Sequence, residues 1–136
     1  MNYLIMLMIA FCLQNDHNQQ INWRTTKEWR IYKLRGHNLF SYPLDTLHNF
    51  QSHSLNQDSM IQFVEDAKVV PRDSIPVWMG EYVASCVFKD RELKLEISTY
   101  GGFFYCEADQ HVYQVPTGLI KEWQDYIISC YRTLYP

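Results

Sequence analysis

Cys106 and His111 are the two residues of this chain whose types and spacing come nearest to a covalent catalyst. A thiol can act as a nucleophile with an imidazole as its general base, and a hairpin between positions 106 and 111 would bring the two side chains together. Reactive cysteines of this kind usually lie at the start of a helix, where the dipole lowers the thiol pKa. Because no helix is expected there, we favour a buried cysteine beside a surface histidine and predict no catalytic residue.

The other candidates for metal binding or acid–base chemistry lack a suitable arrangement. His48 and His53 are five residues apart, whereas two ligands on one face of a helix need a spacing of three or four. The sequence has no Cys-x-x-Cys pair of the kind that holds zinc. Glu92 and Glu96 alternate with Lys94 in a strand-like segment, which is typical of a solvated sheet surface. We therefore expect neither a metal nor a cofactor.

Aromatic residues gather beside Gly101-Gly102, a pair that predicts a tight hairpin turn. Alternation along the following strand places Phe103 and Tyr105 on one face and Phe104 on the other. Exposed aromatic side chains at a hairpin tip are typical of protein-binding surfaces, where tyrosine often dominates the binding energy. The alternative is that a helix or the N-terminal hairpin covers this face. We predict a binding site made of Tyr100, Phe103, Phe104 and Tyr105.

The charges of the chain are divided unevenly. The net charge is −3, whereas nucleic-acid binders normally carry a basic surplus, so we predict no nucleic-acid partner. Residues 36–136 hold seven basic and thirteen acidic residues, and residues 24–35 have a local balance of +4. We interpret the basic residues of this short segment as solvent-facing partners of acidic groups elsewhere; they are Arg24, Lys27, Arg30, Lys33 and Arg35.

The N-terminus combines an apolar run, Tyr3–Leu13, with a polar stretch, Gln14–Gln20. The run is shorter than the roughly 20 residues that a transmembrane helix needs, and it has the length of a secretory signal core. No Lys or Arg precedes it, and Cys12 as a lipid-attachment site would follow Phe11 where a small residue is usual. We expect residues 1–20 to be a signal or lipoprotein-type leader with a spacer, so that the protein is exported, periplasmic or membrane-anchored. The alternative is a core element of a cytoplasmic domain.

The remaining cysteines are Cys86, Cys106 and Cys130, and each is flanked by apolar or aromatic residues. Free cysteine is among the most buried residue types, so core packing is the leading interpretation for all three. The sequence leaves open whether two of them form a disulfide.

A C-terminal helix, Thr117–Leu134, is the strongest structural signal in the sequence. Its apolar residues recur at helical spacing and polar residues fill the other side, so the helix needs a surface to cover its apolar stripe. Thr117 is the expected N-cap. The apolar residues are Leu119, Ile120, Trp123, Tyr126, Ile127, Cys130, Tyr131 and Leu134.

The preceding residues predict a meander of four strands. In the second strand Leu93, Leu95 and Ile97 point inward, and the alternating Glu92, Lys94 and Glu96 point to solvent. The four strands are expected at Met79–Phe88, Glu92–Ser98, Phe103–Ala108 and His111–Val115.

Nearer the N-terminus the sequence predicts a hairpin and an inserted helix. Trp29–Leu34 and Leu39–Tyr42 alternate around turn residues, although a helix over 27–35 is the competing interpretation. Asp45–Phe50 suggests a helical turn, and a polar loop follows over 52–57. A capping-box pattern, Ser59-x-x-Gln62, predicts a helix that runs to Lys68.

These elements predict an α+β fold: one two-layer domain over residues 21–136. In it an antiparallel sheet, the N-terminal hairpin plus the four-strand meander, packs against the inserted helix and the C-terminal amphipathic helix.

For function, we expect a non-catalytic protein that acts through protein–protein interaction, in the manner of an inhibitor or immunity protein, with another protein as its partner. The alternative is a small-ligand domain whose pocket lies between the sheet and the C-terminal helix, lined by Trp123, Tyr126 and Cys130. A small Cys/His hydrolase is the third hypothesis. The oligomeric state is left open.

Overall fold

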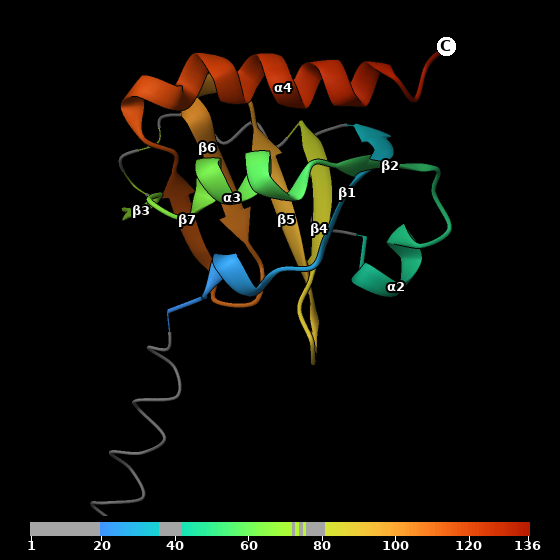
Figure 1. Cartoon of the computed structure of the whole chain (residues 1–136), viewed down its shortest axis with the longest axis horizontal. Coiled ribbons are helices and arrows are strands. Elements are labelled where there is room, and N and C mark those ends of the chain that lie inside the picture. The colour runs from blue at the N-terminus through green and yellow to red at the C-terminus, as the bar shows by residue number, and fades with distance from the viewer. Residues whose placement is uncertain (1–19, 36–41, 72, 74, 76–80) are drawn as a thin grey trace, which may run out of the picture.

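The computed structural model describes residues 20–35, 42–71, 73, 75 and 81–136 (Figure 1). Within them, seven strands form one antiparallel sheet in the order β2-β1-β4-β5-β6-β7-β3, and three α-helices accompany it. This confirms the predicted α+β fold with its C-terminal helix. The strands are β1 (Glu28–Arg35), β2 (Ser52–Leu55), β3 (Lys68–Val70), β4 (Tyr82–Val87), β5 (Glu92–Ser98), β6 (Phe103–Cys106) and β7 (His111–Gln114).

The helices are short except for the last one. They are α2 (Leu44–Leu47), α3 (Gln57–Val64) and α4 (Ile120–Arg132), with 3-10 turns η1 (Trp23–Thr25), η4 (Tyr100–Gly102) and η5 (Thr117–Leu119). In Figure 1, α4 runs along one end of the sheet and α3 lies in front of the strands.

The apolar core lies between the sheet and the helices α3 and α4. Trp123 and Ile127 of α4 are fully buried, as the amphipathic pattern predicted. The Trp123 ring lies 5.5 Å from that of Phe63 on α3 and 5.8 Å from that of Phe104 on β6, measured between centroids. One aromatic ring thus joins both helices to the sheet. Leu95 and Ile97 of β5 face this core, as expected.

Both predicted helix caps are wrong. Helix α3 is capped by Asn56, whose side-chain oxygen accepts a hydrogen bond from the backbone N–H of Ser59 at 2.9 Å. The helix ends at Val64, because the chain then becomes extended to form β3, whose β-branched valines favour a strand. Thr117 is the first residue of the 3-10 turn that precedes α4, and the N-cap of α4 is Leu119, which makes no side-chain cap bond.

In the described residues, β1 lies between β2 and β4 in the sheet. β1 pairs with β2, with Trp29 opposite Leu55, over a segment expected to be a polar loop. A polar edge strand escapes detection by hydrophobic alternation, because only Leu55 among its four residues is buried. Residues 39–41 of the expected second hairpin strand, and residues 1–19 of the expected leader, lie outside the described residues.

The face of the sheet away from α3 and α4 is not the solvated surface that the sequence predicted. Lys94 is only 4% exposed and Glu96 only 1%, although both were expected to face solvent. The segment from Tyr42 to Phe50, which contains α2, covers them: Lys94 Nζ donates to the Tyr42 carbonyl oxygen at 2.7 Å. Leu47 of α2 is fully buried against the same face. The alternation along β5 is as predicted, but the second cover has no signal in the strand itself.

Candidate functional site

The candidate catalytic pair, Cys106 and His111, lies directly opposite in the β6–β7 register. Cys106 is nevertheless fully buried, and burial, with a smaller contribution from Asp109, raises its pKa to about 12. Asp109 instead accepts a hydrogen bond from the Tyr113 hydroxyl and another from the His111 backbone N–H at 3.0 Å. A neutral, inaccessible thiol is the opposite of what a nucleophile requires.

Cys86 and Cys130 are buried and free as well. Burial raises the pKa of both thiols. The three cysteines of the described residues are therefore packing residues in this fold, and none is in a disulfide.

The residues of the hypothetical ligand pocket behave differently from a pocket lining. Trp123 is fully buried between aromatic rings, Cys130 is buried, and the hydroxyl of Tyr126 accepts a hydrogen bond from the backbone N–H of Asn56 at 2.7 Å. Side chains thus fill the space where the pocket was expected.

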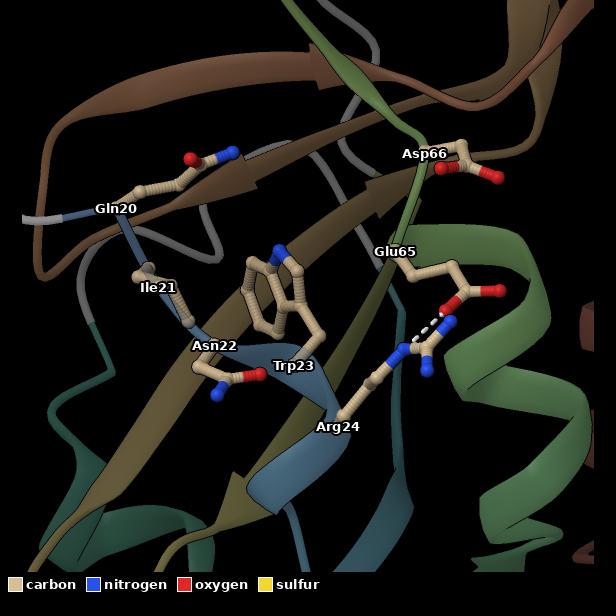
Figure 2. A pocket seen from close by; sticks show the side chains of 7 residues that line it. All are labelled: Gln20, Ile21, Asn22, Trp23, Arg24, Glu65 and Asp66. Atoms are coloured by element: carbon tan, nitrogen blue, oxygen red, sulfur yellow. Dashed lines mark hydrogen bonds and ion pairs between the residues drawn. The ribbon is translucent and has the colours of Figure 1, made fainter.

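Two open hollows lie elsewhere on the surface. The first, of about 280 Å³, is lined by residues 20–24 together with Glu65 and Asp66. Figure 2 shows the Arg24 and Glu65 side chains directed toward each other across it, with Nε and Oε2 2.8 Å apart. The second, of about 390 Å³, is lined by residues 69–71 and 110–112.

Neither hollow gathers a set of chemical groups. The charged guanidinium and carboxylate in the first neutralise each other, and the second offers mainly valine, proline and one imidazole. In the part of the chain that the structure describes, no group of three or more His, Cys, Asp and Glu side chains could hold a metal ion.

The four predicted binding residues do not share one surface. Phe104 is fully buried, with its ring stacked on Tyr113 at a centroid distance of 5.1 Å. Tyr105 is buried and Phe103 is half-buried. Tyr100 is 78% exposed, so it alone of the four presents most of its side chain to solvent.

The turn that carries Tyr100 is fixed to the body of the protein. Gly101 and Gly102 have φ values of 78° and 76°, as the predicted glycine turn requires. A Cβ on Gly102 would lie 2.8 Å from Ile120 and 2.9 Å from Val115, so this turn packs closely against the start of α4. Because its support is close-packed, Tyr100 projects from a rigid base.

A second exposed tyrosine lies at the other end of α4. Tyr135 is 53% exposed, and its hydroxyl is 2.8 Å from that of Tyr131. The Tyr131 ring in turn lies 4.7 Å from the Tyr82 ring of β4. Burial raises the pKa of Tyr82, and the guanidinium groups of Arg35 and Arg132 oppose that rise. The exposed ring is thus the outer member of a row of three tyrosines, Tyr82, Tyr131 and Tyr135, whose rings are tilted to one another.

Two cations lie over rings of this row of tyrosines. Lys33 Nζ lies 4.4 Å from the Tyr135 ring centroid, and Arg35 Cζ lies 5.5 Å from that of Tyr82. Between Ile31 and Arg35, β1 advances four residues while β4 advances two. Such a bulge re-aims side chains. It brings Arg35 opposite Tyr82, where the guanidinium lies over the tyrosine ring.

Both exposed tyrosines lie at one end of the sheet: Tyr135 contacts Lys33 near the end of β1, and Tyr100 follows the end of β5. β1 ends where β4 begins and where β5 ends, because Arg35 pairs with Tyr82 and Tyr82 with Ile97. Glu81 connects Arg35, beside the three tyrosines, with Thr99, which precedes Tyr100. Its Oε2 lies 3.6 Å from Arg35 Nη2 and 3.5 Å from Thr99 Oγ1. Helix α4 runs along this end of the sheet (Figure 1). We call this surface the α4 rim; it consists of Lys33, Arg35, Glu81, Tyr82, Tyr100, Tyr131, Arg132 and Tyr135.

Of these residues, only Tyr100 was among the binding residues predicted from the sequence. One signal was available: Ile31, Lys33 and Arg35 alternate on one face of β1, so that face changes from apolar to cationic at its end. A second was the spacing of Tyr131 and Tyr135, four residues apart at the end of a helix.

Comparisons with protein-family models, with curated proteins and with solved structures find no significant match. Among the described residues, the helices are too short or too polar to cross a membrane.

Proposed function

We propose that this chain acts by binding another protein, without catalysis, and that the α4 rim is its docking surface. Small inhibitors and immunity proteins work in this way. The likeness to them is one of size and architecture.

The observation that carries the proposal is the pair of exposed tyrosines, one on a close-packed turn and the other in contact with Tyr131 and Lys33. Of the large hydrophobic side chains exposed in the described residues, two are Tyr100 and Tyr135, and both belong to the α4 rim; the third is Val69. Tyrosine offers a large contact area at a small entropic cost and is enriched among binding hot spots.

The size of the rim also suits a protein partner. Helix α4 has 13 residues, so at about 1.5 Å per residue the two tyrosines flank a span of about 20 Å. A standard interface covers about 800 Å² on each partner, which is a patch of comparable width.

Capture from an extract of the native host tests this proposal. The tagged full-length chain would be immobilised as wild type, as the Tyr100→Ala/Tyr135→Ala double variant and as Val69→Ala. Val69 is 53% exposed, like Tyr135, and lies outside the rim, so it is a matched control. We expect one protein to be retained by wild type and by Val69→Ala and lost by the double variant, with all three melting at similar temperatures.

Two results would contradict the proposal. One is a double variant that retains the same proteins as wild type. The other is a Val69→Ala variant that loses the partner as completely as the double variant, since that would place binding at the β3 edge.

Export or membrane tethering belongs to the same proposal but depends on the sequence alone. The apolar run Tyr3–Leu13 supports a leader, and an interaction protein with a leader would meet its partner outside the cytoplasm. The intact mass of the protein from its native host tests this: cleavage or lipid attachment near Cys12 supports export, and an unprocessed N-terminus supports the cytoplasmic alternative.

A further inference from the structure

We propose that the partner presents an acidic segment to one end of the α4 rim, where Lys33 lies over Tyr135, Arg35 lies over Tyr82, and Arg132 follows Tyr131 at the end of α4. This inference rests on the proposed function and adds the chemistry of the partner to it. Of the four charged residues in the rim, Lys33, Arg35 and Arg132 are basic, and Glu81 is acidic.

The basic residues of the rim differ from Arg24 and Arg30, two other basic residues of the same segment. Arg24 and Arg30 donate hydrogen bonds to carboxylates, at 2.8 Å to Glu65 and 2.5 Å to Glu28. Arg35 reaches Glu81 only at 3.6 Å, beyond hydrogen-bond distance. Among the described residues, neither Lys33 nor Arg132 has an ion pair. The rim cations therefore keep donors for an external carboxylate.

The aromatic contacts hold these cations in place without using up their hydrogen bonds. A cation over a tyrosine ring is attracted to the face of the ring, which leaves its N–H groups directed elsewhere. A guanidinium in that position can donate two parallel hydrogen bonds to one carboxylate. Arg35 is the guanidinium over Tyr82, and Lys33 places an ammonium over Tyr135 that can donate to the same carboxylate.

The charge of the rest of the chain favours an acidic protein segment over a nucleic acid. Residues 36–136 carry thirteen acidic and seven basic residues, so the cationic end of the rim is a local exception on an acidic chain. A long polyanion would be repelled by the surrounding charge, whereas a short acidic segment could contact the three cations alone.

A fluorescein-labelled peptide rich in glutamate, with leucine interspersed, is a suitable probe. Its binding to the full-length chain would be followed by fluorescence anisotropy, beside a peptide in which lysine replaces each glutamate. We expect the acidic peptide to bind and the basic one not to bind. The charge reversal Lys33→Glu/Arg35→Glu should weaken binding about tenfold or more. Raising the salt from about 50 mM to about 300 mM should weaken it as well.

The matched control is Lys68→Glu/Lys89→Glu, which makes the same change of charge at two exposed residues outside the rim. At about 0.1 M salt we expect this variant to bind the acidic peptide within about twofold of wild type, because exposed charges farther apart than about 10 Å are then largely screened. Equal losses in both double variants would overturn the proposal, since binding would then follow net charge alone. Tighter binding of a single-stranded RNA oligonucleotide than of the acidic peptide would also overturn it.

The same variants separate this inference from the proposed function. If Tyr100→Ala/Tyr135→Ala loses the captured host protein and Lys33→Glu/Arg35→Glu retains it, the docking surface stands and the acidic partner is wrong. If both variants retain the host protein, both proposals fail.

Discussion

Two groups of aromatic side chains in this protein have opposite surroundings. In the core, Trp23, Phe63, Phe104 and Trp123 contact other rings, often edge to face, and are buried. On the α4 rim, Tyr100 and Tyr135 are exposed to solvent, and Tyr135 also contacts Tyr131 and Lys33. Aromatics make up 15% of the chain, a proportion that cannot show which of them bind and which only pack.

The comparison indicates that the surroundings of an aromatic side chain, more than its residue type, determine whether it stabilises the core or remains available at the surface. A ring packed against other rings contributes through buried area, at about 25 cal/mol per Å². A ring beside a cation at the edge of the sheet contributes little to folding and remains available to a partner. Mutations in the two groups should therefore separate stability from binding.

The largest effect is expected for Trp123→Ala in the core. Loss of this fully buried ring between α3, α4 and β6 should lower the free energy of unfolding by about 3–5 kcal/mol. Urea unfolding followed by circular dichroism would measure it. Trp123→Phe is the control, and it should cost clearly less because a ring remains. An alanine variant as stable as wild type would show that α4 is not packed on the sheet as described.

The next largest effect is expected where the rim joins the core. Gly102→Ala should cost about 1–3 kcal/mol, since φ is 76° and the new Cβ would collide with Ile120 and Val115. Gly118→Ala is the matched control, because nothing lies within 4 Å of its Cβ position. Thermal melts of both variants would compare them. An equal cost at the two positions would argue against close packing of η4 on α4.

Alkaline pH should weaken the core through its thiols. In the unfolded chain a cysteine loses its proton above its ordinary pKa of 9.0, while the folded Cys106 keeps its proton up to about pH 12. The unfolded state then binds fewer protons, so stability falls as pH rises through this range, by about 1.4 kcal/mol per pH unit for each such thiol.

The check is urea unfolding of wild type and Cys106→Ala at about pH 8 and about pH 10. The wild type should lose about 1.4 kcal/mol more than the variant between these pH values. Equal losses would mean that Cys106 already titrates normally in the folded protein, which is incompatible with its burial.

The smallest effect on folding is expected on the rim. Tyr135→Ala removes a half-exposed ring and the contact of Lys33 with it, and should change stability by less than about 1 kcal/mol. Differential scanning calorimetry would measure it, with Tyr135→Phe as a control that removes only the hydroxyl contact to Tyr131. A loss as large as that of Trp123→Ala would make Tyr135 a scaffold residue and remove the contrast between rim and core.

The core could be predicted from the sequence because its signals are local and periodic. The alternation of Leu93, Leu95 and Ile97 and the helical spacing of Trp123 and Ile127 each identified a buried face directly. Such patterns need no knowledge of what covers them.

The far face and the rim could not be predicted because they depend on segments that meet only in the folded chain. Lys94 looks solvent-exposed in β5, but its side chain is buried, and its Nζ donates to the carbonyl oxygen of Tyr42, in a segment that covers this face. Likewise, Lys33 and Tyr135 are separated by about a hundred residues and meet through the β1 bulge and the end of α4. Phe104 shows the converse: its hairpin position suggested exposure, but the turn directs it into the core.

Tyrosine nitration, mapped by peptide mass spectrometry, tests the central claim most directly. It would be carried out on the full-length chain alone and on the same chain with its captured partner. The account predicts that Tyr100 and Tyr135 are nitrated in the free chain, that the buried Tyr113 is spared, and that the partner protects both exposed rings. If both rings stay equally reactive in the complex, the α4 rim is not the docking surface.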